Sequence, residues 1–146
     1  MFNKLRIAVV IFITTVLVGV VTATPTGMVQ SELNKGWRFR QARLQQWRTA
    51  TVPGVVHTDL LDHGLIEDPF FRLNERSVQW VDKEDWVYET TFDIPAKMLG
   101  YKNYRLVFNG LDTYADVELN GEKILSADNM FLSLIHISEP TRLQLI

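Results

Sequence analysis

The chain contains no cysteine among its 146 residues. This excludes disulfide bonds, zinc–thiolate sites and cysteine nucleophiles. An excess of charge of one sign is also lacking, since 15 Lys and Arg are balanced by 17 Asp and Glu for a net charge of −2. No run of Lys or Arg offers a surface for a phosphate backbone, so we expect no nucleic-acid partner. Internal repeats and low-complexity linkers are absent as well, and the length allows one domain.

The first residues have the composition of a secretory signal. Lys4 and Arg6 precede an apolar run over residues 7–21, and Val21-Thr22-Ala23 places small or apolar residues before a cleavage point. We therefore predict that residues 1–23 form a hydrophobic signal-peptide helix that is removed at its end. The alternative is a membrane anchor, but the run is shorter than the about 20 apolar residues of a bilayer span. After cleavage we expect no stable membrane association and a secreted or periplasmic protein, or a lysosomal one in a eukaryote.

Between residues 33 and 131, short runs alternate apolar with polar residues, which is the pattern of strands with one buried face. Asn120-Gly121 predicts a type I′ hairpin, because both central residues of that turn have positive φ. Short helical pieces are expected over Thr58–His63 and Pro95–Leu99, each followed by a glycine. This spacing predicts an all-β fold, an antiparallel jelly roll or β-sandwich, over residues 33–131. The expected strands cover residues 37–40, 86–93, 104–109, 115–119 and 122–125.

The connection that leads to Trp86 is long and dense in polar and aromatic residues. Long ordered loops on a β scaffold tend to carry function. Its motifs and those that follow are, in order, Val52-Pro53-Gly54-Val55-Val56-His57, Asp68-Pro69-Phe70, Asn74-Glu75, Val78-Gln79-Trp80, Phe108-Asn109-Gly110-Leu111-Asp112, Leu119-Asn120-Gly121 and Ala127-Asp128-Asn129-Met130-Phe131. This series resembles the N-terminal galactose-binding-like, or jelly-roll, domain of β-mannosidases in glycoside hydrolase family 2.

The resemblance implies a larger enzyme. In that family the jelly roll is followed by immunoglobulin-like domains and a (β/α)₈ barrel with two catalytic glutamates, and terminal β-mannosides are hydrolysed with retention. Retention needs an acid/base carboxyl and a nucleophilic carboxylate about 5–5.5 Å apart. No residue of this chain matches either glutamate, so we expect no catalytic residue, no cofactor and no hydrolase activity in this chain alone. The intact parent enzyme is expected to bind a β-mannoside oligosaccharide or glycan.

Four residues of the long connection are candidates for sugar binding, because by family likeness this loop faces the mouth of the barrel. They are Asp68, Asn74, Glu75 and Trp80. Their amide and carboxylate groups suit sugar hydroxyls, and an indole face suits sugar C–H surface. The alternative is structural: Asp68 caps the turn at Pro69, and Trp80 packs at a domain interface.

Other polar and aromatic residues indicate structure rather than chemistry. His57 and His63 lack the spacing of metal ligands, so no metal site is expected. Asp112 and Asp116 are separated by about 13 Å if they share a strand, which is too far for a retaining pair, and turn capping is expected instead. The tryptophans expected in the core or at an interface are Trp37, Trp47 and Trp86.

After Phe131 the sequence departs abruptly from the family pattern. We predict that residues 132–146 are a non-native tail derived from adapter or vector sequence; a genuine divergent strand is the alternative. The jelly roll would then lack closing strands, and its open apolar edges predict aggregation of the isolated chain. Two other functions stay open: a stand-alone carbohydrate-binding or interaction module, and the same domain of a β-galactosidase or β-glucuronidase relative.

Overall fold

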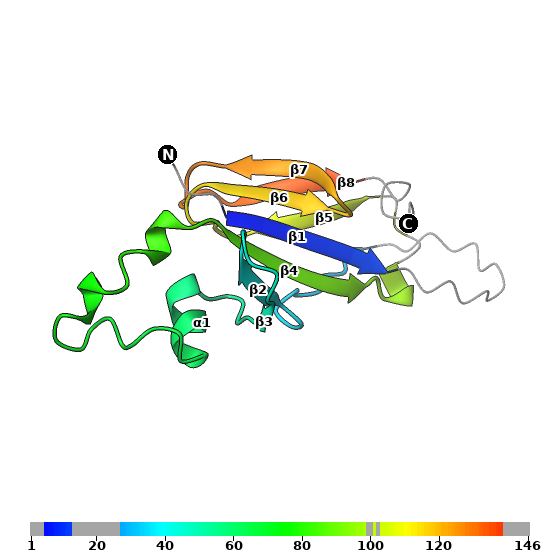
Figure 1. Cartoon of the computed structure of the whole chain (residues 1–146). Helices are drawn as coiled ribbons and strands as arrows, with labels where there is room; N and C mark the ends of the chain where they lie inside the picture. Colours follow the sequence, from blue (N-terminus) through cyan, green and yellow to red (C-terminus); the bar gives the residue numbers. More distant parts are fainter. Residues whose placement is uncertain (1–4, 13–26, 99–100, 102, 139–146) are drawn as a thin grey trace.

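The structure, a computed structural model, describes residues 5–12, 27–98, 101 and 103–138. They form a β-sandwich of a six-stranded and a two-stranded sheet (Figure 1). The strands are β1 (Leu5–Phe12), β2 (Arg38–Gln41), β3 (Arg48–Thr49), β4 (Trp86–Asp93), β5 (Tyr104–Phe108), β6 (Ala115–Leu119), β7 (Glu122–Ala127) and β8 (Leu134–Ser138). The helical segments are α1 (Val56–Asp62) and the 3₁₀ turns η1 (Asn74–Arg76), η2 (Val81–Lys83) and η3 (Ala96–Met98). The predicted all-β sandwich is confirmed.

The larger sheet has the strand order β3-β2-β4-β1-β6-β7, and the smaller sheet pairs β5 with β8. In Figure 1 the small sheet lies behind β6 and β7, and α1 lies on the side of β2 and β3. The pairs β2–β3, β2–β4, β5–β8 and β6–β7 are antiparallel. Only β1 departs from this pattern among the described strands, since it is parallel to both of its neighbours.

The core lies on the face of the larger sheet where alternate residues of β4 and β6 are buried. Phe39 on β2, 1 % exposed, and Val117 on β6, 0 % exposed, are the most enclosed of its large side chains. The ring of Phe39 stacks on that of Tyr88 with the centroids 5.6 Å apart. Full burial of such an apolar side chain contributes about 1.5–3 kcal/mol. Besides Tyr88 and Val117, the buried residues of β4 and β6 that face the core are Trp86, Thr90, Ala115 and Leu119.

The hairpin between β6 and β7 has the predicted turn. Asn120 and Gly121 adopt φ of 53° and 80°, as a type I′ turn requires. The predicted helical pieces are present as well: α1 begins two residues before Thr58, and Gly64, with φ of 63°, follows its end. Within the described part of the chain, no helix combines the length and the apolar content needed to span a bilayer.

The predicted helix of the leader is wrong over Leu5–Phe12, which form β1. This segment contains β-branched Ile and Val, whose side chains favour extended backbone. The unpaired backbone groups of β4 and β6 supply its hydrogen-bond partners on both sides, which an isolated leader sequence does not reveal. The rest of the apolar run and the predicted cleavage point lie outside the described residues, so the signal peptide stays a prediction.

The start of the predicted foreign tail belongs to the small sheet. Leu134–Ser138 form β8, which pairs antiparallel with β5. Residues 139–146 lie outside the described part of the chain. A foreign strand can pair with an open edge as well as a native one, so the origin of residues 132–146 stays a prediction.

Candidate functional site

The connection from α1 to β4 projects beyond the end of the sandwich (Figure 1). It runs from Gly64 to Asp85 and includes the short turns η1 and η2. All four residues predicted to bind sugar lie on it. Little of its backbone lies in regular helices, and none in strands. Its shape therefore depends on turns and on side-chain contacts.

Asp68 and Asn74 shape the middle of this connection. Asp68 Oδ1 accepts a 2.9 Å hydrogen bond from the backbone N–H of Phe70, across Pro69. The Asn74 side-chain amide donates a 3.0 Å bond to the carbonyl of Asp68. These bonds form the capped turn that was the structural alternative for Asp68. Asp68 is itself exposed, so its carboxylate also reaches solvent.

Glu75 and Trp80 lie further along, at η1 and just before η2. The backbone carbonyl of Glu75 accepts a 2.9 Å hydrogen bond from Gln79 Nε2, and the Glu75 side chain is exposed. Trp80 is 39 % exposed, and its ring centroid lies 6.1 Å from that of the buried Trp86 at a tilt of 45°. Part of an indole face therefore reaches solvent from a fixed position. The structure brings the four residues onto one connection; their role in sugar binding stays a prediction.

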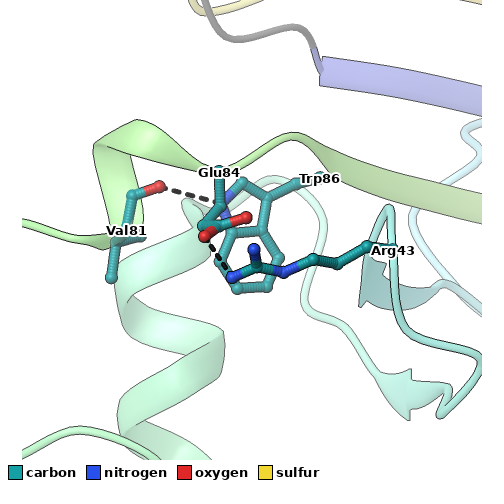
Figure 2. Close-up of polar contacts among 4 residues, drawn as sticks. All are labelled: Arg43, Val81, Glu84 and Trp86. Atoms are coloured by element: carbon teal, nitrogen blue, oxygen red, sulfur yellow. Dashed lines mark hydrogen bonds and ion pairs between the residues drawn. The ribbon is translucent and has the colours of Figure 1, made fainter.

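Two contacts fix the end of the connection where it enters β4 (Figure 2). The indole N–H of Trp86 donates a buried 3.0 Å hydrogen bond to the carbonyl of Val81. The guanidinium of Arg43, from the segment between β2 and β3, forms an ion pair with the Glu84 carboxylate. Together the two contacts hold η2 beside the start of β4, while the middle of the connection extends outward.

The projecting middle exposes large apolar side chains. Phe70 is 97 % exposed, and Phe71 and Leu73 are exposed as well. Arg72 lies over the Phe71 ring with its guanidinium carbon 5.2 Å from the centroid. Contiguous exposed apolar residues rimmed by polar ones are typical of surfaces that contact another domain or ligand.

A hollow of about 1770 Å³ lies between the two sheets and reaches the same end of the molecule. Its wall includes aromatic residues of both sheets, such as Trp86 and Tyr104, together with His57 and Asp82 at its rim. The His57 ring nitrogen Nε2 lies 3.9 Å from a carboxylate oxygen of Asp82. An apolar wall with a few polar groups at the mouth is typical of a ligand pocket, although the same form arises where further chain packs between two sheets.

The carboxylates and histidines that invited a chemical interpretation are engaged elsewhere. Asp116 accepts 2.7 Å bonds from Lys123 and from Ser126. The Asp112 carboxylate accepts a hydrogen bond from the Thr113 hydroxyl. The His63 ring lies 2.8 Å from the carbonyl of Thr49. Within the described ranges, no group of three His, Asp or Glu side chains could hold a metal ion.

The predicted core tryptophans divide into two kinds. Trp37 and Trp86 are buried, as predicted. Trp47 is half-buried and lies between two guanidinium groups, with the Arg38 and Arg40 carbons 4.6 and 4.8 Å from its ring centroid. Cation–π contacts of this kind contribute about 0.5–1 kcal/mol at exposed sites, so this ring stabilises the β2–β3 edge rather than offering a free stacking face.

One buried polar pair was not predicted. Asp59, 2 % exposed, accepts hydrogen bonds from the Tyr88 hydroxyl at 2.7 Å and from the Thr51 backbone N–H at 2.8 Å. Burial, followed by the hydrogen bond to Asp59 and its charge, raises the pKa of Tyr88. The only sequence signal was a carboxylate in the first turn of a short helix, where it also complements the helix dipole. This pair holds α1 on β4 and leaves Asp59 with no free oxygen for chemistry.

The chain was compared with known proteins. A profile of the family described as "Glycosyl hydrolase 2 galactose-binding domain-like" matches residues 37–138. Beta-mannosidase B of Emericella nidulans is 44 % identical over 108 residues, which cover 71 % of this chain and 13 % of that protein. The beta-mannosidase of Mus musculus is 38 % identical over 99 residues, covering 68 % and 11 %.

A solved structure agrees with these relatives. The crystal structure of a beta-D-mannosidase from Dictyoglomus thermophilum superposes with a TM-score of 0.70 and 45 % identity, over 72 % of this chain and 13 % of that one. The chain thus spans between 11 % and 13 % of the length of the curated relatives named above. The matched residues include every strand from β2 to β8 and the whole projecting connection. This chain belongs to the glycosyl hydrolase 2 galactose-binding domain-like family.

Proposed function

We propose that this chain is the N-terminal, non-catalytic domain of a secreted exo-acting β-mannosidase that hydrolyses terminal β-D-mannose residues with retention. The observation that carries the proposal is the identity of 38–45 % to beta-mannosidases of a fungus, a mammal and a bacterium over one domain. The parent enzyme would be a glycoside hydrolase whose substrate is a β-mannoside oligosaccharide or glycan.

The engaged carboxylates support a non-catalytic role for the domain itself. A retaining glycosidase needs two carboxyl groups about 5–5.5 Å apart, one of them free to attack the sugar. Here Asp59 is tied to Tyr88 and Thr51, and Glu89 is paired with Arg38 at 2.7 Å. We therefore expect the catalytic pair to lie elsewhere in the longer protein and this chain alone to be inactive.

The projecting connection is the part of the domain that we expect to meet the rest of the enzyme. Its exposed Phe70 and Phe71 suit an apolar contact with another domain. Asp68, Asn74, Glu75 and Trp80 would then lie beside the active site, where polar groups and an indole face can orient a sugar.

The test is to clone the longer reading frame across the codons that follow residue 131 and to assay its product on aryl β-mannosides, β-galactosides and β-glucuronides. We expect release from the mannoside, with the β-anomer of mannose as the first product in an NMR time course. Selective release from another sugar would assign the enzyme to a relative of different specificity. A frame that encodes no barrel, together with glycan binding by this chain in calorimetry, would favour a stand-alone binding module instead.

The role of the connection has its own test in the active longer protein. Trp80→Ala should raise KM for the mannoside with a smaller change in kcat, because the indole would bind substrate without taking part in bond cleavage. The matched control is Trp47→Ala, whose ring is held between two arginines at the far edge of the sheet. Equal kinetics for the two variants would remove Trp80 from the substrate site.

A further inference from the structure

The sequence contains two Asn-Gly pairs, Asn109-Gly110 and Asn120-Gly121. The side-chain amide of an asparagine can be attacked by the backbone nitrogen of the next residue, which forms a five-membered succinimide ring and releases ammonia. Glycine after the asparagine favours this reaction, because it has no Cβ to obstruct the approach and its backbone turns easily. Both pairs are chemically suited to deamidation, so the surrounding structure determines which of them reaches the geometry of ring closure.

The hairpin between β6 and β7 holds Asn120 away from that geometry. Ring closure requires rotation about the Cα–C bond of the asparagine, until Cγ lies over the next backbone nitrogen. Asn120 and Gly121 have φ of 53° and 80° in a turn that is closed by the pairing of Leu119 with Glu122. Leu119 and the side-chain nitrogen of Asn120 are both buried. Ring closure at Asn120 would therefore have to open the end of the hairpin.

The other pair, Asn109-Gly110, lies just beyond the end of a strand. Phe108 is the last residue of β5 and pairs with Leu134. Residues 109–114 then form neither helix nor strand before β6 begins. Asn109 and Gly110 are both exposed, and both line the hollow between the two sheets. Rotation about the Asn109 Cα–C bond breaks no strand pairing, and water reaches the amide.

We propose that Asn109 is a deamidation site of the folded chain and that its hairpin protects Asn120. The Gly110 nitrogen forms a bond to Cγ of Asn109, the Cγ–Nδ2 bond breaks, and the side-chain NH2 leaves as ammonia with the proton of the Gly110 nitrogen. Water then opens the ring at either carbonyl, which gives aspartate or isoaspartate. The reaction needs no reactant besides water, so the inference goes beyond the proposed function and does not depend on it.

Either product changes the loop between β5 and β6. A negative charge is added beside the exposed Asp112, and isoaspartate also lengthens the backbone by one carbon directly after β5. The modified chain can therefore be separated by ion exchange and identified by its mass. Digestion after Arg, Lys and Glu separates residues 106–118, which contain Asn109, from residues 119–122, which contain Asn120.

The test compares the folded chain with the chain unfolded in urea, both incubated at mildly alkaline pH, and follows each fragment by mass spectrometry. In urea the two asparagines should react at similar rates, because the hairpin is lost. In the folded chain Asn109 should react about tenfold faster than Asn120, since reaction at Asn120 waits for local opening. Equal rates in the folded chain, or a faster reaction at Asn120, would overturn the proposal.

Asn129 is the internal control, because it is exposed but followed by Met130 rather than glycine. If Asn109 reacted no faster than Asn129 in the folded chain, the proposal would also fail. Asn109→Gln should remove the fast reaction, since a glutamine side chain closes a six-membered ring much more slowly. Persistence of the original rate in this variant would indicate direct hydrolysis instead of attack by the Gly110 nitrogen, and would overturn the proposal. Asn103→Gln, at another exposed position, is the matched variant and should leave the rate at Asn109 unchanged.

Discussion

The hydroxyl of Tyr88 on β4 donates a 2.7 Å hydrogen bond to Oδ2 of Asp59 on α1, and both residues are buried. The other carboxylate oxygen, Oδ1, accepts from the backbone N–H of Thr51, in the segment that precedes the helix. One carboxylate thus joins a core strand, the helix and the turn before it. Since a buried carboxylate without donors is costly, this pairing determines how α1, and the connection that follows it, are placed on the sheet.

Removal of the Tyr88 hydroxyl should destabilise the domain. Tyr88→Phe keeps the ring stack on Phe39 but leaves Asp59 Oδ2 without its donor, which should lower the free energy of unfolding by about 1–3 kcal/mol in urea titrations. Tyr104→Phe is the matched control, because it loses a 2.6 Å bond to the carbonyl of Met98 at a less buried position. Equal losses in the two variants would contradict a special role for the Tyr88–Asp59 pair.

The same pair predicts a loss of stability at alkaline pH. Burial, then the hydrogen bond to Asp59 and its charge, raise the pKa of Tyr88 in the folded chain above the ordinary tyrosine value of about 10. The stabilisation is complete below about pH 10 and falls as pH rises further, because the unfolded chain releases the phenol proton while the folded chain retains it. Urea unfolding at a series of pH values should show this fall, and Tyr88→Phe should reduce it. An unchanged slope in the variant would assign the effect to other groups, such as Tyr104, whose pKa is raised by burial.

Local patterns predicted the parts of the fold that depend on neighbours in sequence. The Asn120-Gly121 turn and the alternation of Trp86, Tyr88 and Thr90 each follow from backbone or side-chain periodicity within a few residues. β1 could not be predicted in this way, because its extended form depends on two neighbouring strands that come more than seventy residues later in the chain.

Candidate site residues show the same division. Asp68 was recognised by its place before Pro69, and its capping bond to Phe70 N–H depends on that local sequence. Asp59 was missed, because its partners Thr51 and Tyr88 meet it only after α1 packs on the sheet. The periodicity of apolar residues indicates which face of an element is buried. It does not indicate which polar group, distant in sequence, will form a hydrogen bond on that face.

Core packing beneath α1 should be sensitive to truncation. Leu60 is 2 % exposed on the buried face of the helix, and Leu60→Ala removes methyl groups from a packed site, which costs about 2–5 kcal/mol. Leu73→Ala is the control, since that side chain is 63 % exposed on the projecting connection. Urea unfolding should separate the two; a large loss from Leu73→Ala instead would mean that the connection is packed against something in solution.

The turn before α1 should reject a side chain at Gly54. A Cβ built there would lie 2.3 Å from the carbonyl oxygen of Thr51, a backbone atom that cannot rotate away. Gly54→Ala should therefore lower the free energy of unfolding by about 1–3 kcal/mol, as overpacking does. Gly110→Ala is the milder comparison, because its nearest contact, with the Met130 carbonyl, is 3.1 Å. If Gly54→Ala proved neutral in urea titrations, the turn would have to be more open in solution than in the structure.

The final prediction concerns the hold on the projecting connection. Trp86→Phe keeps an aromatic ring in the core but removes the N–H that bonds the Val81 carbonyl at 3.0 Å. The carbonyl then keeps only the longer 3.4 Å bond from the Glu84 N–H, so the loss should cost about 0.5–1.5 kcal/mol, and η2 should detach from the sheet more often. Amide exchange of residues 78–84 should accelerate more than exchange in β6, and proteolysis within residues 64–83 should become faster.

Glu84→Gln, which breaks only the partly exposed pair with Arg43, should cost less than about 1 kcal/mol and change exchange little. If Glu84→Gln loosened the connection more than Trp86→Phe, the ion pair rather than the indole bond would be its principal anchor.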